Sequence, residues 1–438
     1  MKKYLLIILL LTFGTQWIFS QSILTLEDAK KIAIDNSYNT QISKNNILSI
    51  ENNTRLIKAG HKPTFSLSAG LNGQLSNNNV KVFTAPESQT NWFAPSLSSN
   101  IGAAGNYLLW DGHQINNRVK QNEATSKKAQ LSLKATNEEI VYQVENIYLN
   151  ILQLLERQKL LEESIEISYK RKLRAQYAFE YGQSNKLNLL NANVDLNRDS
   201  LDLIRFTQQV VNLKRNLNLL LNRDINIDYS LENDLNFEKN KIINQKEFIE
   251  KAISSNINIL EAKESLNISS YDKAINNSNL KPQVFANASY GLNYQKNSAP
   301  NFIDYSFSDG LRLGLSATWL IGDGGRTKIL NENADIRIKT QSLIVKQLED
   351  QVKMSISNLL GDYGNALRLY NLELENVATA QENFERSQEL FNQAQINSIT
   401  FRQAQLNLLN TKLSVASAKY EILLLQLDLE KLKGGLLK

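Results

Sequence analysis

The chain has 438 residues, of which 42% are hydrophobic and 21% charged, and it contains no cysteine. The lack of cysteine excludes disulfides, thiolate metal sites, cysteine nucleophiles and an acylated N-terminal cysteine. The formal charge of +5 falls to +3 when Lys2 and Lys3 are removed with an N-terminal signal, which is close to neutral for this length and predicts no nucleic-acid partner.

Residues 1–20 have the pattern of a cleaved secretory signal. A positively charged start precedes an apolar run from Tyr4 to Phe13, and Ser20 is a small residue before an expected cleavage at Gln21. The alternative, a retained membrane anchor, is disfavoured because the run is too short to span a bilayer. No later apolar run reaches about 18 residues, so any membrane role of the exported chain has to use strands.

Very long helices are predicted after the strand regions. From Gly112 to about Tyr181 there is no proline and no interior glycine, and Asp111 suits the N-cap of this helix. A helix of about 70 residues is on the order of 100 Å long, far beyond the usual helix of a globular domain. A coiled-coil seam is predicted because apolar residues recur in steps of four and three, at Ile140, Val144, Ile147, Ile151 and Leu154.

The sequence contains an internal duplication. Trp110-Asp111-Gly112 recurs as Gly322-Asp323-Gly324 at an offset of 212 residues, and the same offset matches Asn185 to Asn397. We therefore predict a first repeat (21–221), a polar linker with little regular structure (222–246) and a second repeat (247–438). The expected helices are residues 26–37, 39–59, the pair within 112–221, 245–254, 257–279 and the pair within 325–433, and the expected strands are residues 64–76, 97–110, 283–295 and 310–320.

The four strands alternate between apolar and small polar residues. Each is about ten residues long, the length that a tilted strand needs to cross a bilayer. The small polar face suits a wet lumen and the apolar face suits lipid. The candidate lipid-facing residues are Phe65, Leu67, Leu71, Ile101, Tyr107, Val284, Tyr290, Leu313, Leu315 and Trp319.

Four strands cannot close a membrane barrel, which starts at about eight, and open sheet edges are not tolerated in lipid. Several copies of the chain must therefore pool their strands. Two copies would make a narrow barrel filled by side chains, whereas three copies give twelve strands with room for a lumen. The predicted fold is mostly α with a membrane β-barrel, in a homo-oligomer for which three is the smallest number that makes a pore.

This plan resembles the TolC-like outer-membrane efflux protein family. The resemblance covers the chain after the signal and rests on the order of elements, the strand-to-helix turns and the turns with their following Asn191-Ala192 and Gln403-Ala404-Gln405. It implies a homotrimer in the outer membrane of a Gram-negative bacterium, whose twelve-stranded β-barrel continues into an α-barrel across the periplasm. The implied partners are a periplasmic adaptor, an inner-membrane pump of the proton-driven or ABC type, and outer-membrane lipid. The duct would conduct substrates passively, with no catalysis, no metal and no cofactor.

The resemblance also implies a gate where the turns of the two long helix pairs lie. Several family members carry aspartates on the second turn, whereas the matching positions here are Thr400 and Gln403, with Arg402 between them. We therefore expect a neutral or basic entrance, which matters because rings of charged side chains set ionic preference in pores. The candidate gate or adaptor-contact residues are Gly182, Ser184, Asn185, Lys186, Asn397, Thr400, Arg402 and Gln403.

Two other classes of function compete with a conduit. An exported coiled-coil scaffold of the periplasm would bind partners without conducting, but it has no use for four alternating strands of membrane length. An exported hydrolase would need a nucleophile with its base or paired carboxylates in a cleft. The acids are instead spread along helix faces, and neither His61 nor His113 has a histidine at metal-ligand spacing.

Overall fold

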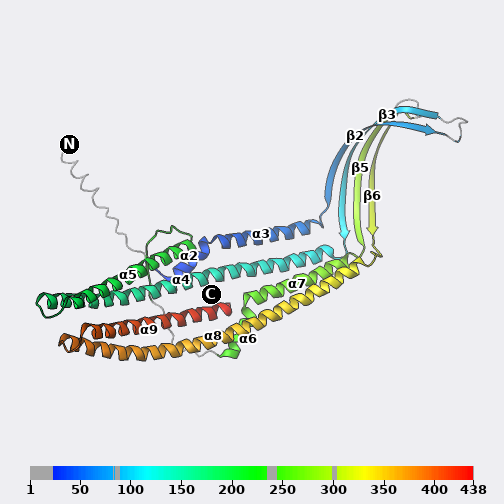
Figure 1. Cartoon of the computed structure of the whole chain (residues 1–438). Coiled ribbons are helices and arrows are strands. Elements are labelled where there is room, and N and C mark those ends of the chain that lie inside the picture. Colours follow the sequence, from blue (N-terminus) through cyan, green and yellow to red (C-terminus); the bar gives the residue numbers. More distant parts are fainter. Residues whose placement is uncertain (1–22, 82, 84–88, 234–243, 298–302, 438) are drawn as a thin grey trace, which may run out of the picture. The chain divides into compact units, whose positions relative to one another are not determined.

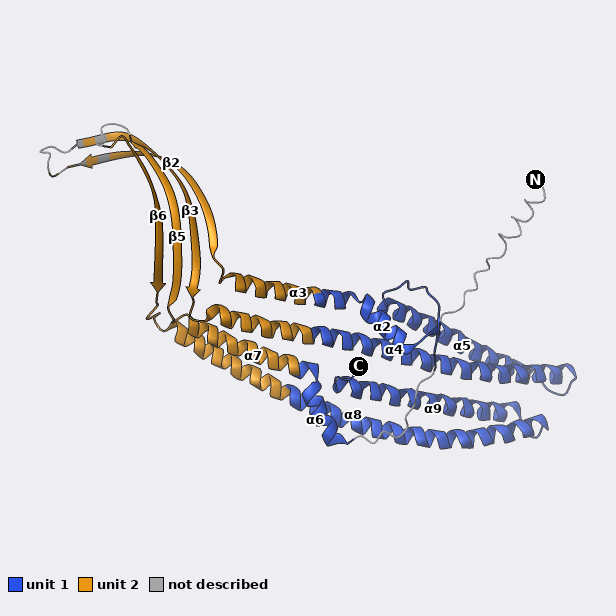
Figure 2. Cartoon of the chain, turned by 180° about the vertical axis from the view of Figure 1, so that it is seen from behind, with its two compact units in different colours: residues 1–44, 132–259, 348–438 blue, residues 45–131, 260–347 orange. Residues whose placement is uncertain are grey.

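The computed structural model describes residues 23–81, 83, 89–233, 244–297 and 303–437. The chain divides into two compact units, each built from segments of both sequence halves (Figure 2). Unit 1 combines residues 1–44, 132–259 and 348–438, and unit 2 combines residues 45–131 and 260–347. The expected signal lies outside the described residues. The division into two repeats around 222–246 stays a prediction.

The helices repeat with the predicted offset (Figure 1). Helices α4 (Gln114–Glu180) and α8 (Arg326–Asn392) each have 67 residues, and α5 (Lys186–Leu220) and α9 (Ser398–Leu432) each have 35. The shorter helices are α2 (Leu26–Asn36), α3 (Tyr38–Ala59), α6 (Gln245–Ser255) and α7 (Ile257–Ser278). Among the described residues, no helix combines the length and the hydropathy needed to cross a membrane.

The core of unit 1 lies where α2, α4, α5 and α9 pack together. It includes Val144, Tyr148 and Ile151 of α4, which are at most 1% exposed. The Tyr148 hydroxyl donates to the carbonyl oxygens of Leu24 (3.0 Å) and Glu232 (2.8 Å). These two carbonyls flank a short parallel pair of strands, β1 (Ile23–Leu24) and β4 (Ser230–Leu231). The strand β4 was not expected, because it lies in the region predicted as an unstructured linker.

Unit 2 contains a four-stranded antiparallel sheet. Its strands are β2 (Thr64–Val80), β3 (Gln89–Trp110), β5 (Gln283–Asn297) and β6 (Tyr305–Thr318), in the order β2-β3-β5-β6. Most are longer than predicted, because the alternation was followed only through its apolar residues. The last strand ends at Thr318, so Trp319 lies just beyond it and its indole nitrogen donates to the Leu280 carbonyl (3.0 Å).

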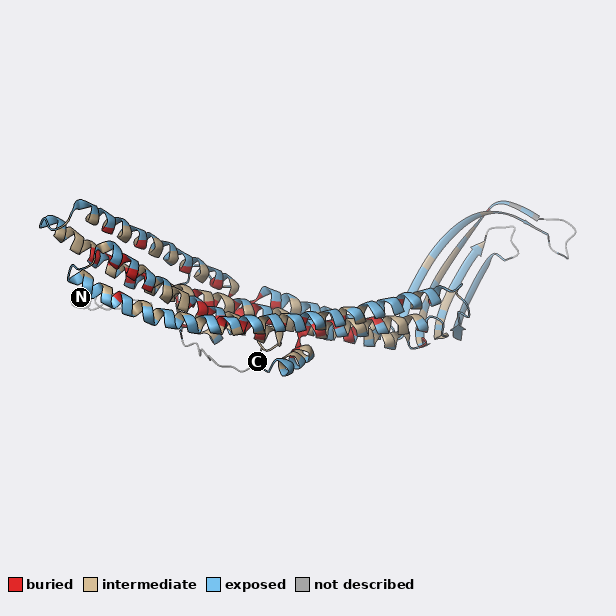
Figure 3. Cartoon of the chain, turned by 60° about the horizontal axis from the view of Figure 1, so that its bottom comes forward, coloured by how far each residue is buried: buried red, intermediate tan, exposed pale blue. Residues whose placement is uncertain are grey.

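The strand register places the predicted apolar residues on one face of the sheet. Leu67 pairs with Ala103, Ala103 with Tyr290, and Tyr290 with Leu311, and directly paired residues point to the same side. This face is uncovered in the single chain: Phe65 is 83% exposed, Leu67 80% and Leu315 77%. Figure 3 shows the same contrast, because the buried residues gather on helices while the strands are largely exposed.

Strand-to-helix turns are set by two equivalent aspartates. An Asp111 carboxylate oxygen accepts from the backbone nitrogen of Ile115 (2.6 Å), as expected for the N-terminal cap of α4. Asp323 accepts in the same way from the Thr327 nitrogen (2.7 Å) at the start of α8. The hydrogen bond from the Thr327 hydroxyl, together with those from backbone nitrogens, holds the pKa of the Asp323 carboxyl below its usual value.

Candidate functional site

The two helix pairs of unit 1 end in turns of the same geometry. Gly182 (φ 71°) in the α4–α5 turn and Ala394 (φ 58°) in the α8–α9 turn both have positive φ, 212 residues apart. In each turn the next residue donates its backbone nitrogen to a carbonyl five residues back: Gln183 to Ala178 (2.7 Å) and Gln395 to Leu390 (2.8 Å). This closing pattern of a Schellman motif needs a left-handed residue, which glycine adopts without strain.

An asparagine then starts the returning helix in each turn. The Asn185 side chain accepts from the Asn188 nitrogen (3.1 Å), and the Asn397 side chain accepts from the Thr400 nitrogen (2.9 Å). These side-chain oxygens satisfy backbone donors that a helix start leaves unpaired. The two predicted asparagines thus have the same role in the two turns.

The predicted gate residues fall into two groups. Most of them are exposed or half-buried at the turns, namely Gly182, Ser184, Asn185, Lys186, Asn397, Thr400 and Gln403. Arg402 differs from this expectation, because its side chain is only 9% exposed and lies between helices. It therefore does not present a free positive charge at the turn, although its position in the sequence suggested one.

Arg402 lies at the centre of a buried polar cluster that joins three helices. Its guanidinium donates to both carboxylate oxygens of Asp199 on α5 (2.5 and 2.8 Å) and to the hydroxyl of Ser168 on α4 (3.0 Å). Ser168 also donates to Asp199 (2.6 Å), and Gln405 of α9 donates to Ser168 (2.9 Å). A bidentate arginine–carboxylate pair of this kind fixes orientation as well as distance.

A second arginine–aspartate pair balances the charge of the cluster. Arg171 of α4 is ion-paired with Asp195 of α5, and the Arg171 side chain is 2% exposed. Burial lowers the pKa of the Arg171 guanidinium, while the Asp195 carboxylate opposes that shift. Two arginines and two aspartates leave the cluster neutral, as burial requires, since an unpaired buried charge is costly.

Aromatic residues extend the contact toward the turns. The Phe401 ring of α9 stacks on Phe391 of α8, with centroids 4.8 Å apart, and on Phe384 at 5.5 Å. Arg174 of α4 lies over the Phe391 ring, 4.5 Å from its centroid, and donates to the side-chain and backbone oxygens of Asn392 (2.9 and 3.0 Å). The end of the α4–α5 pair is thereby tied to the end of the α8–α9 pair.

Sequence reasoning missed Asp195 and Asp199. Their spacing of four on a helix places both carboxylates on one face, which is a usable signal. Nothing in the sequence gives the register of α5 against α9, so the partner of these aspartates could not be identified. The duplication offers a second signal, because the positions equivalent to Asp199 and Arg402 are the uncharged Thr411 and Leu190.

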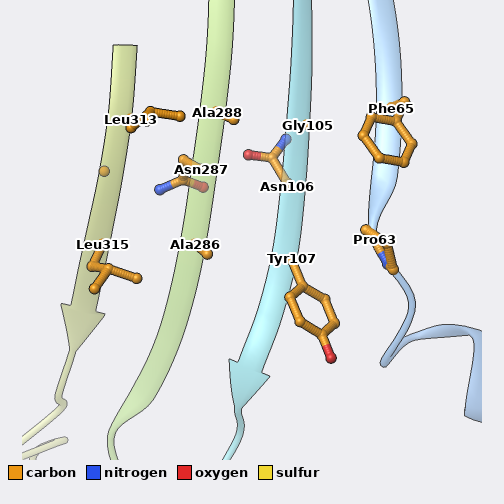
Figure 4. Close-up of a pocket in the computed structure, with 11 residues that line it drawn as sticks. Pro63, Phe65, Gly105, Asn106, Tyr107, Ala286, Asn287, Ala288, Leu313 and Leu315 are labelled. Atoms are coloured by element: carbon orange, nitrogen blue, oxygen red, sulfur yellow. The ribbon is translucent and has the colours of Figure 1, made fainter.

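The apolar face of the unit 2 sheet has a hollow of about 630 Å³. Figure 4 shows its walls, with Phe65 and Tyr107 on one side and Leu313 and Leu315 on the other. Its floor is formed by small residues, since Gly105 pairs with Ala288 across β3 and β5. No acid, base or nucleophile lines it. Across the part of the chain that the structure describes, no group of three or more metal-ligating side chains could hold an ion.

Comparison with known proteins follows from this architecture. Residues 33–223 match the family model of the outer membrane efflux proteins, from α2 to just after the end of α5. The chain belongs to this family. Comparison with curated proteins gives no match.

Solved structures agree with the fold over nearly the whole efflux protein. The outer membrane protein VceC of Vibrio cholerae is 14% identical with a TM-score of 0.75, covering 94% of this chain and 96% of that one. The outer membrane channel CmeC of Campylobacter jejuni is 15% identical (TM-score 0.72; 94% and 85% covered). The open state of MtrE from Neisseria gonorrhoeae is 14% identical (TM-score 0.72; 94% and 89% covered). At these identities the likeness describes the fold.

The predicted fold class and location are confirmed. The protein is a mostly helical outer membrane efflux channel of TolC-like fold in a Gram-negative bacterium. Related channels are trimers of tripartite systems, which gives the general kind of partner. The identity of the adaptor and of the pump is a separate question.

Proposed function

We propose that three copies of this chain form a passive duct without catalytic activity, which conducts substrates from an inner-membrane pump across the periplasm and the outer membrane. The strands would pool into a twelve-stranded barrel, and the long helices would form the periplasmic tunnel. A periplasmic adaptor would join the tunnel to a pump of the proton-driven or ABC type.

The observation that carries this proposal is the sheet of unit 2. Its apolar face is uncovered in the single chain, and its edge strands β2 and β6 have no strand partner among the described residues. Exposed edges of this length favour pairing with another chain. Lipid is the environment that accepts a face of Phe, Leu and Tyr on one side and small polar residues on the other. The candidate lipid-facing residues named from the sequence are therefore proposed to contact lipid.

A gate at the turns is the second part of the proposal. The cluster of Arg402, Asp199 and Ser168 holds α9 against α4 and α5 close to both turns. Moving the α8–α9 end away from the α4–α5 end would have to break these bonds. The entrance would therefore stay narrow in the isolated protein, and the adaptor would have to supply contacts that replace them.

Planar-bilayer recording of the full-length protein tests the duct and its entrance together. We expect discrete conductance steps, and Lys186→Glu should shift the reversal potential toward cations because Lys186 is exposed at the first turn. The matched control is Lys412→Glu, a lysine further along α9. An unchanged reversal potential in Lys186→Glu would remove Lys186 from the entrance, and the absence of any conductance together with carbonate extraction from membranes would refute the duct.

Partner identity is addressed by affinity capture from mildly cross-linked membranes. An adaptor captured with a proton-driven pump would assign the duct to efflux of small molecules, and an adaptor captured with an ATP-driven transporter would assign it to peptide or protein secretion. The scaffold alternative predicts a soluble periplasmic protein. It is disfavoured because it leaves the apolar face of the sheet exposed to water.

A further inference from the structure

Charge is nearly absent from the sheet. The four strands contain three charged residues, Lys296, Asp309 and Arg312. Two of them belong to the apolar face: Lys296 continues the series of Leu292 and Tyr294, and Asp309 pairs directly with Leu292. Arg312 is the only charged residue on the polar face of the described strands.

The two charges of the apolar face have partners. The Lys296 ammonium lies 4.0 Å from a carboxylate oxygen of Asp304, and Asp309 accepts from the Tyr290 hydroxyl at 2.9 Å. Arg312, by contrast, makes no ion pair and no hydrogen bond with another described side chain, and it is exposed. Its charge is therefore directed to the space in front of the polar face rather than into the sheet.

The surroundings of Arg312 keep that space open. Arg312 pairs with Ser289 on β5, in a row that continues through Ala104 to Ser66. The neighbouring residues on the same face of β6 are Gly310 and Gly314, and a Cβ added to either would meet nothing within 4 Å. The next row consists of Ser68, Gly102, Gly291 and Gly310. A long cationic side chain thus stands above a wall of the smallest residues.

We propose that Arg312 is a charge-selecting residue of the lumen, whose three copies form a cationic ring that favours small anionic solutes such as carboxylates, sulfonates and phosphates. This inference rests on the proposed trimeric duct, because only a closed barrel directs the polar face inward and brings three copies around one axis. A ring of like charges in a narrow polar pore sets ionic preference by raising the local concentration of counter-ions. An arginine also binds carboxylates and phosphates in a bidentate manner.

A thiol placed beside Arg312 measures this field without requiring conduction. The sequence contains no cysteine, so Ser289→Cys introduces a single thiol directly across from Arg312. Its labelling rates with a negatively charged (sulfonatoethyl) and a positively charged (trimethylammonioethyl) methanethiosulfonate are compared in full-length protein in membranes. Any effect of Arg312 on the reactivity of the thiol itself cancels in the ratio of the two rates.

We expect the ratio of anionic to cationic labelling to be highest with Arg312 present, lower by about twofold in Arg312→Gln at 0.1 M salt, and lower again in Arg312→Glu. The differences should grow at 0.01 M salt, where the screening length is about 30 Å rather than about 10 Å. Lys296→Gln is the matched control for loss of a positive charge, because Lys296 belongs to the other face.

Ala288→Cys separates failure of the ring from failure of the duct. Ala288 is adjacent to Ser289 but lies on the apolar face, so its thiol should resist both reagents. If Ser289→Cys is labelled, Ala288→Cys is protected and the ratio is the same with Arg, Gln or Glu at position 312, the ring is refuted and the duct stands. If Ala288→Cys is labelled and Ser289→Cys is protected, the polar face does not line a lumen, and both proposals fail.

Discussion

The α4–α5 pair and the α8–α9 pair have the same backbone and different chemistry. Helix lengths, turn positions and the left-handed turn residue agree at the offset of 212. The buried charges do not repeat: the first pair supplies Arg171, Asp195 and Asp199, and the second supplies Arg402. The geometry of each pair is therefore local, whereas the polar cluster exists only when both pairs are present.

The largest effect expected from this difference is that of Asp199→Ala. It would leave the buried Arg402 guanidinium without its carboxylate, at a cost of about 3–5 kcal/mol. Hydrogen exchange of the first turns of α9 measures the resulting local opening. Thr411→Ala is the control at the equivalent position of the second pair, where the hydroxyl bonds only to its own helix, and it should change exchange little.

A double variant distinguishes an uncompensated charge from lost packing. Asp199→Leu with Arg402→Leu removes both charges, and it should restore most of the protection that Asp199→Ala loses, since apolar replacement of a buried pair is often neutral. If the double variant opens as much as the single one, the cluster holds the helices through packing and hydrogen bonds to Ser168 rather than through charge.

The turn residues test how far the two backbones are equivalent. Ala394→Gly should stabilise the α8–α9 turn by about 1 kcal/mol, because glycine adopts positive φ without the steric cost that alanine has there. Gly182→Ala should destabilise the other turn by about the same amount, since a Cβ at Gly182 meets no other atom and only the backbone strain remains. Hydrogen exchange at residues 178–188 and 390–400 is the readout. Equal signs for the two substitutions would show that the turns are not equivalent.

The helix caps should respond alike in both pairs. Asn185→Ala and Asn397→Ala each remove one side-chain acceptor from a helix start, and each should cost about 1 kcal/mol of local stability. Fraying of the first turn, followed by hydrogen exchange of Asn188 and Thr400, measures it. A cost confined to one of the two caps would mean that the other helix start is held by contacts across the pair.

Periodicity was sufficient for the elements and insufficient for the contacts. Helix bounds followed from the proline-free stretches and the 212-residue offset to within a few residues, and the apolar face of the strands followed from alternation. The strand β4 was missed because two residues carry no periodicity. The partner of Arg402 was missed because the register between helices more than 200 positions apart depends on packing of the whole unit. Site residues at turns are therefore more predictable than buried charged residues beside them.

The smallest effect concerns another pair of equivalent acids, Glu138 and Asp350. Glu138 is 6% exposed and its Oε1 has no hydrogen-bond partner, whereas Asp350 is exposed and bonded to Lys353 (2.9 Å). Burial raises the pKa of the Glu138 carboxyl above its usual value, against the opposing charges of Lys134 and Lys431.

A folded pKa above the unfolded one means that the folded state binds the proton more tightly. Protection of α4 around Glu138 should therefore rise as the pH falls from 7 through that raised pKa, and level off near the unfolded value of about 4.5. Glu138→Gln should give less than about 1 kcal/mol of added local stability at pH 7 and remove this pH dependence, because it deletes the buried charge while keeping the shape. Asp350→Asn should do neither. A wild-type protein whose exchange at residues 134–142 is flat between pH 7 and 5 would show that Glu138 is ionised and solvated in the trimer, and the contrast between the two acids would then belong to the single chain alone.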